Sequence, residues 1–131
     1  MRVLFHSSLA LATILLAACS STPSLSAMYG TWQLVESRDD STGTHPIGET
    51  MQVMPGAVAR FTSPGAESRQ VRFSTFRGPI EYPATGQDPE GLLMEMEGEP
   101  EIFIVTMPTR NLLQFAANGL SGLSFTYRRV R

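Results

Sequence analysis

The fold class of this 131-residue chain is decided by the segment Leu92-Leu93-Met94-Glu95-Met96-Glu97-Gly98-Glu99-Pro100-Glu101-Ile102-Phe103-Ile104-Val105-Thr106-Met107. In its first part apolar side chains alternate with glutamates, which is the two-residue period of a β-strand with one buried face and one face in water. A turn signal with Gly98 and Pro100 follows, and the next run is nearly all apolar, as in a well-covered strand. The segment therefore predicts two neighbouring strands joined by a short turn.

The same rhythm of short apolar runs and turn residues extends in both directions, and no stretch has a long run of helical spacing. Turn signals include Pro55-Gly56, Pro64-Gly65 and Asn118-Gly119. Asn-Gly is a favoured two-residue hairpin turn because both residues tolerate positive φ. The expected strands are residues 31–37, 50–54, 57–63, 69–76, 92–97, 101–107, 111–116 and 121–130, with longer polar loops at 38–49 and 78–91.

Short turns between successive strands give an antiparallel meander. A meander of about eight strands has to close or to stack as a sandwich, because open edges leave backbone groups unpaired. We expect closure. The predicted fold is all-β, a small antiparallel up-and-down β-barrel of about eight strands, with the longer loops at its mouth or sides.

The N-terminus has the parts of an export signal. A positive charge at Arg2 is followed by an apolar run from Leu9 to Ala18 that is broken only by Thr13. This run is too short to span a bilayer as a helix, which takes about 20 residues. It predicts a signal peptide, which has to be left out of fold reasoning.

Leu16-Ala17-Ala18-Cys19 resembles the lipobox of bacterial lipoprotein precursors. The resemblance implies a lipid on Cys19 and removal of residues 1–18. The alternative is a cysteine that happens to lie in an ordinary signal peptide or a membrane helix. Ser20 follows, where lipoproteins kept in the inner membrane tend to have Asp, so the resemblance favours the periplasmic face of the outer membrane.

Three parts of the chain follow from this. Residues 1–18 are the signal peptide, residues 19–28 are the lipidated cysteine with a small, polar tether for which no structure is expected, and residues 29–131 are one domain. Cys19 is the only cysteine, so the domain has no internal disulfide and depends on its core.

Without residues 1–18 the chain keeps nine of its ten basic residues and all 12 acidic ones, a net charge of about −3. No basic cluster is long enough to neutralise a run of phosphates. A nucleic acid is therefore not expected as a partner, which leaves the membrane, a small apolar ligand or an envelope protein.

Both ends of the expected domain carry a further pattern. The domain begins with Tyr29-Gly30-Thr31-Trp32 and ends with a strand containing Tyr127-Arg128-Arg129. Here the chain resembles the calycin superfamily, the lipocalins and small lipocalin-like barrels, in which a Gly-x-Trp opens the first strand and an arginine of the last strand packs across the Trp. If Tyr127 faces inward, alternation makes Arg129 the partner of Trp32; Arg128 is the alternative. Another small β-domain with a core Trp would also fit, and a Thr-Asp-Tyr-like segment of the family is absent.

No catalytic or metal site can be assembled from the sequence, so no enzyme activity, metal or cofactor is expected. His6 leaves with the signal peptide, and His45 stands alone in a polar loop, where we expect it to be exposed to solvent. The acidic residues near the strand at 92–97 favour a solvated face over a carboxylate pair or a calcium site. They are Glu90, Glu95, Glu97, Glu99 and Glu101.

The apolar residues leave two functions open. The first is a lipocalin-like cup on the outer membrane that binds a small apolar molecule or lipid. The second is an accessory envelope lipoprotein that acts through protein contacts, with a filled and ligand-free barrel as its scaffold. The candidate ligand-lining residues, with Trp32 at the floor, are Leu34, Phe61, Phe73, Met94, Met96, Phe103, Phe115 and Tyr127.

Overall fold

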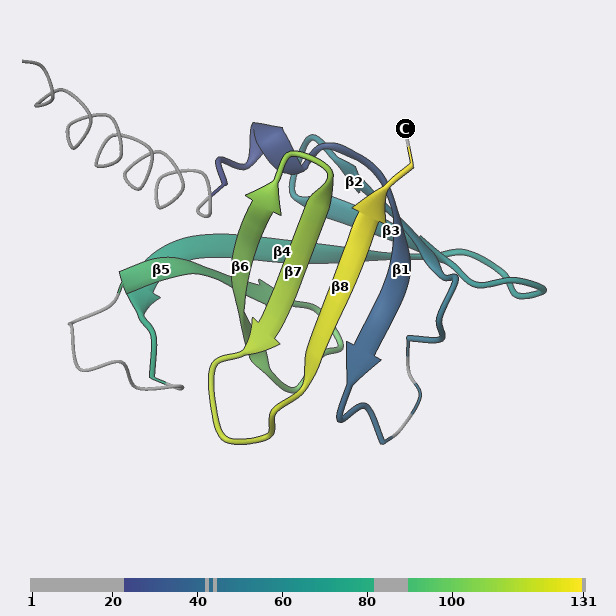
Figure 1. Cartoon of the computed structure of the whole chain (residues 1–131). Helices are drawn as coiled ribbons and strands as arrows, with labels where there is room; N and C mark the ends of the chain where they lie inside the picture. The colour runs from purple at the N-terminus through teal and green to yellow at the C-terminus, as the bar shows by residue number, and fades with distance from the viewer. Residues whose placement is uncertain (1–22, 42, 44, 82–89, 131) are drawn as a thin grey trace, which may run out of the picture.

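The computed structural model describes residues 23–41, 43, 45–81 and 90–130. The expected signal peptide and Cys19 lie outside the described residues. Eight antiparallel strands pair in chain order and close into a barrel, because β1 pairs with both β2 and β8 (Figure 1). This confirms the predicted all-β, eight-stranded, up-and-down barrel. The strands are β1 (Gly30–Arg38), β2 (Thr50–Met54), β3 (Val58–Thr62), β4 (Arg69–Pro79), β5 (Glu90–Met96), β6 (Ile102–Thr109), β7 (Leu112–Ala117) and β8 (Ser124–Arg129).

The alternation that predicted the strands also sets which side chains fill the barrel. In β5, Met94 and Met96 are buried in the core and Glu95 is exposed. In β8, Phe125 and Tyr127 point inward in the same way. One apolar core therefore occupies the inside of the barrel.

Two expected loops differ from the structure. The loop predicted at 78–91 is shorter, because β4 continues to Pro79 and β5 begins at Glu90, with Gly78 opposite Gly91. The expected two-residue turn at Asn118-Gly119 is wrong, since β7 ends at Ala117 and β8 begins only at Ser124. Asn118 is held elsewhere: its backbone N–H donates to Ile102 O at 2.8 Å.

The expectation that residues 20–28 have no structure is wrong for their last part. Residues Ser26–Met28 form one turn of 3-10 helix, η1, and the Met28 side chain is fully buried in the core. An apolar side chain of this size gains about 1.5 to 3 kcal/mol by leaving water. This gain and the hydrogen bonds of Trp32 and Arg129 to the turn act against the cost of ordering the segment, so η1 is part of the barrel.

The barrel has two different ends. Its floor is the end at which β1 begins and η1 lies, and its mouth is the end that carries the β1–β2 loop and the β5–β6 turn. Within the described part of the chain, no helix is long and apolar enough to cross a bilayer.

Candidate functional site

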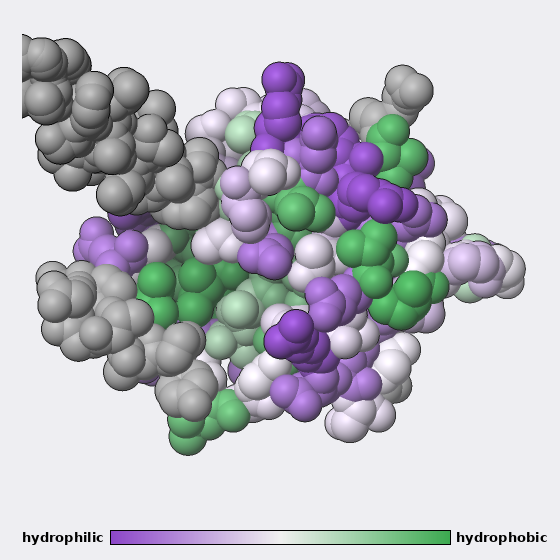
Figure 2. All heavy atoms as spheres, viewed as in Figure 1, coloured by the Kyte–Doolittle hydropathy of each residue, from purple (hydrophilic) through white to green (hydrophobic). Residues whose placement is uncertain are grey.

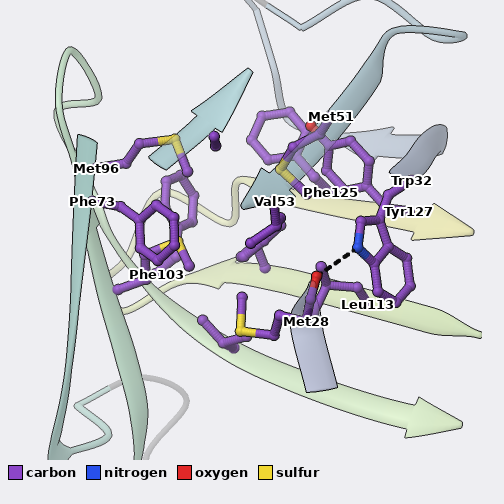
Figure 3. Packing of buried hydrophobic residues seen from close by; sticks show 14 of the residues in the cluster. Met28, Trp32, Met51, Val53, Phe73, Met96, Phe103, Leu113, Phe125 and Tyr127 are labelled. Atoms are coloured by element: carbon purple, nitrogen blue, oxygen red, sulfur yellow. Dashed lines mark hydrogen bonds between the residues drawn. The ribbon is translucent and has the colours of Figure 1, made fainter. Parts of the chain in front are cut away.

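At the floor, the Trp32 indole is fully buried and its Nε1 donates a hydrogen bond to Met28 O at 2.9 Å, the dashed line in Figure 3. The Arg129 guanidinium carbon lies 4.2 Å from the centre of the Trp32 rings, a cation-π contact. Arg128 is exposed on the other side of β8. Of the two arginines considered from the sequence, Arg129 is thus the one that packs on Trp32.

Arg129 also ties three segments together. Its Nε donates to Arg110 O at 3.0 Å, its Nη1 to Tyr29 O at 3.0 Å and its Nη2 to Ala27 O at 2.9 Å. These carbonyls belong to the β6–β7 turn, to the residue between η1 and β1, and to η1. Gly30, which follows Tyr29, adopts a φ of 134°, a backbone conformation that L side chains rarely allow.

All eight candidate ligand-lining residues point into the barrel and are buried in one core. Figure 3 shows several of their side chains packed against one another across the interior. The Phe115 ring lies 6.2 Å from that of Phe103 and 5.7 Å from that of Tyr127, both edge to face. The void among these side chains is about 10 Å³, which is room for about one water molecule. In this conformation the side chains themselves fill the interior.

The expectation that His45 is exposed is wrong. Its side chain lies under the mouth, 5% exposed, between the rings of Phe61 and Phe125 at 5.1 and 5.0 Å. Its Nδ1 is 2.6 Å from Glu49 Oε1 and its Nε2 is 2.7 Å from Glu99 Oε2. The two carboxylates come from the β1–β2 loop and the β5–β6 turn, so His45 joins the two segments that cover the mouth.

Two opposing effects set the charge of this ring. Burial by itself lowers the pKa of His45, because it penalises the charged form, but the hydrogen bonds and negative charges of Glu49 and Glu99 outweigh burial and raise the pKa from 6.5 to about 9. His45 is therefore an imidazolium at neutral pH. The Tyr127 hydroxyl beside Glu49 has its pKa raised well above 10, first by burial and then by the nearby carboxylates.

Glu49 is also almost completely buried, and the Ser63 hydroxyl donates to its Oε2 at 3.3 Å. The expected solvated glutamate face is thus wrong for Glu99, whose side chain is engaged at the mouth. It holds for Glu90, Glu95 and Glu97, which are exposed, and Glu101 is half-buried. We call His45, Glu49 and Glu99 the mouth cluster. The sequence carries only a weak sign of it, the four-residue spacing of His45 and Glu49.

The chemistry open to the mouth cluster is narrow. Both ring nitrogens of His45 are already bound to carboxylates, so the ring has no lone pair with which to take a proton from a substrate. The two carboxylates lie on opposite sides of the ring. Among the described residues, no group of three or more His, Cys, Asp and Glu side chains could hold a metal ion. The cluster therefore works as an electrostatic clasp between two loops.

A second apolar group lies on the outside of the barrel. We define the outer-face cluster as Phe76 of β4, Ile80, Leu93 of β5, and Ile102 and Ile104 of β6. Leu93 and Ile104 are 3% and 8% exposed although they do not belong to the interior core. Phe76 and Ile102 remain 41% and 38% exposed. In Figure 2 green residues gather at the left of the view, where Figure 1 places β5 and β6.

The segment after β4 crosses this outer face. The Asn118 side chain accepts a hydrogen bond from Glu81 N at 2.7 Å and donates one to Pro79 O at 3.1 Å. A Cβ atom on Gly91 would lie 2.9 Å from Ile80 Cδ1, so the glycine makes room for that side chain. The crossing segment covers part of the outer-face cluster and leaves Phe76 and Ile102 at its border.

Comparisons with protein-family models, with curated proteins and with solved structures gave no match to this chain.

Proposed function

We propose that this protein is an accessory lipoprotein of the bacterial envelope that acts through contacts with another envelope protein. Its filled barrel is the scaffold, and its outer-face cluster is the contact surface. The lipid on Cys19 holds it on a membrane, and Ser20 favours the periplasmic face of the outer membrane.

The observation that carries this proposal is the state of the interior. A barrel that binds a lipid-like ligand needs a cavity of several hundred Å³, and the void here is about 10 Å³. The floor is stoppered by Met28 and Trp32, and the mouth is covered by the loop of His45. The polar and apolar groups left for recognition are therefore on the outside.

The outer-face cluster supports a protein partner. Phe76 and Ile102 expose apolar surface next to the buried Leu93 and Ile104, so a partner would extend an apolar layer that already exists. A shallow groove beside them also carries polar groups of Glu81 and Glu101 at its rim. An apolar centre with a polar rim is the usual composition of a protein contact.

Site-specific photocrosslinking in living cells tests the proposal. A benzoylphenylalanine at position 76 or 102 is expected to capture one defined envelope protein. The matched control at Gln52, an exposed polar residue of β2, should capture none. Capture of no protein from either cluster position, while a small molecule co-purifies with the barrel, would contradict the proposal.

A second candidate function is the binding of a small apolar ligand inside the barrel. The observation that favours it is the place of the void, directly under the clasp of His45 and Glu99 and beside the flexible thioethers of Met51 and Met96. Opening of the clasp and movement of these side chains would enlarge the void. Native mass spectrometry of protein purified from cells tests this, and a barrel that carries no molecule would count against it.

A further inference from the structure

The C-terminal half of β4 has a strand partner on one side only. On that side β5 pairs with β4 from Phe73 to Pro79. On the other side the ladder with β3 ends at Val58 and Arg72, and its last hydrogen bond runs from Phe73 N to Ala57 O at 3.0 Å. In Figure 1, β4 continues well past β3 with β5 beside it.

Alternation identifies which backbone groups point to the unpaired side. Arg72 O accepts from Glu97 N at 2.9 Å, so even-numbered residues of β4 face β5, and odd-numbered ones face β3. Beyond Phe73 the odd-numbered residues are Thr75 and Arg77. Their N–H and C=O groups face a side on which no strand of the described chain pairs with them. Pro79 has no N–H and ends this edge.

We propose that this edge of β4 binds an extended segment of a partner protein by β-strand addition, with an acidic side chain of the partner beside Arg77. This proposal rests on the proposed function, because it states how the envelope partner binds to the barrel. The N–H groups of Thr75 and Arg77 are two donors, and their C=O groups are two acceptors, at the spacing of a β-ladder. This arrangement matches the backbone of an extended peptide. Phe76 lies between the two edge residues, on the outer face, where it would cover an apolar side chain of the added strand.

Charge favours a foreign strand over a second copy of this chain. β4 carries Arg69, Arg72 and Arg77 in a protein with a net negative charge. The Arg77 side chain is 57% exposed and reaches Glu90 only at 3.8 Å, so it can turn to a partner carboxylate. Antiparallel pairing of two β4 edges around Phe76 would place the two Arg77 side chains diagonally opposite each other, which is unfavourable.

Selection of peptides on the purified mature protein tests the proposal. Random heptapeptides displayed on phage are expected to yield binders that are rich in β-branched residues and contain Asp or Glu. Thr75→Pro removes one free donor and should weaken binding of the selected peptide at least tenfold. Thr75→Val keeps that N–H and should bind as the wild type does. Arg77→Glu should weaken binding at least tenfold and provides a second reading if the proline variant folds poorly.

Hydrogen exchange gives the position of the bound peptide. The amides of Thr75 and Arg77 should exchange at least tenfold more slowly when the peptide is bound, while the amide of exposed Arg60 in β3 should not change. Equal binding by wild type, Thr75→Pro and Arg77→Glu would overturn the proposal. So would a wild-type dimer, measured by light scattering, that becomes monomeric in Thr75→Pro, because the occupant would then be a second copy.

The two proposals fail in different ways. A protein that crosslinks at position 76 or 102 in both wild-type and Thr75→Pro cells would overturn strand addition and leave the envelope contact in place. Peptides that protect Thr75 and Arg77 while no cellular protein crosslinks at the outer face would overturn the proposed contact surface and leave strand addition in place.

Discussion

Burial usually favours a neutral histidine, yet the ring of His45 carries a proton at neutral pH because two carboxylates lie within hydrogen-bond distance. The protonated ring in turn stabilises Glu49, a glutamate that is 1% exposed and would otherwise be a costly buried charge. The burial of each of His45, Glu49 and Glu99 therefore depends on the other two.

The raised pKa of His45 makes the stability of the barrel depend on pH. A group whose pKa is higher in the folded state contributes fully below its unfolded pKa, here 6.5, and its contribution is lost as the pH rises through the folded pKa of about 9. A shift of this size corresponds to about 3 kcal/mol. Urea denaturation should show the free energy of unfolding falling by about that amount between pH 6.5 and pH 9.5.

His45→Gln is the control for this pH dependence. The variant should be less stable at pH 6.5 and should lose most of the fall between pH 6.5 and 9.5, because it lacks the imidazole whose pKa is raised to about 9. A wild-type stability that stays level across the window would show that the ring is not held protonated by the clasp.

Arg129 stabilises the floor through three hydrogen bonds and one cation-π contact. Arg129→Ala should lower the free energy of unfolding by about 2 to 3 kcal/mol, because three backbone carbonyls lose a charged donor. Arg128→Ala, an exposed neighbour on the same strand, should change it by less than about 0.5 kcal/mol. Chemical denaturation of both variants checks this, and equal effects would contradict the assigned role of Arg129.

At the scale of elements, η1 shows how a short segment becomes part of a fold. Its one turn has a single buried side chain, Met28, and its last carbonyl binds the Trp32 indole. Arg129 binds another carbonyl of the turn, that of Ala27. The barrel thus holds the segment through contacts that add to the segment's own 3-10 hydrogen bonds, such as Met28 N to Leu25 O at 3.0 Å.

Met28→Ala should destabilise the protein by about 2 to 4 kcal/mol, because it leaves a cavity at the floor. Ser26→Ala, in the same turn but exposed, should change stability by less than about 0.5 kcal/mol. Thermal unfolding of the pair checks the prediction. A Met28→Ala variant as stable as wild type would mean that η1 is detached from the barrel in solution.

The elements that the sequence predicts well are those with local signals. The alternation of Met94, Glu95 and Met96 is enough to orient β5, because the period of a strand is a property of neighbouring residues. The predicted two-residue turn at Asn118 is wrong because its side chain and backbone bind segments that are distant in sequence. These bonds override the turn preference of Asn. The packing of Met28 depends in the same way on distant segments, because the core that buries it is built from strands along the whole barrel.

The contacts of the candidate site can be divided in the same way, into those that have a signal in the sequence and those that do not. The contact of Trp32 with an arginine from the end of the chain could be foreseen from a family-like pattern, and alternation separates Arg129 from Arg128. The burial of His45 could not be foreseen, because Glu99 is 54 positions away and reads as one more exposed acid on a turn. Partners separated by this distance in sequence are set by how the strands pair.

At the scale of the whole molecule, the proposed lipid anchor on Cys19 is predicted to be separable from the barrel. If Cys19 carries the proposed lipids, Cys19→Ala should move the protein from the membrane pellet to the soluble fraction, because those lipids would supply the membrane affinity. Its melting temperature should stay within about 1 °C of that of the wild type stripped of membranes by detergent, since the described core begins after this residue. Fractionation by ultracentrifugation and labelling with radioactive palmitate check this; a variant that still sediments with membranes would contradict the anchor.

The pairing of β1 with β8, the seam of the barrel, determines when the barrel can close during synthesis. It joins residues from opposite ends of the domain, and the arginine at the seam binds carbonyls about a hundred positions earlier in the chain. A nascent polypeptide that still lacks its final strand has neither the seam nor the arginine that covers the indole. The barrel therefore closes as one late event, only once β8 has been synthesised, and until then the growing chain lacks the contacts that close it.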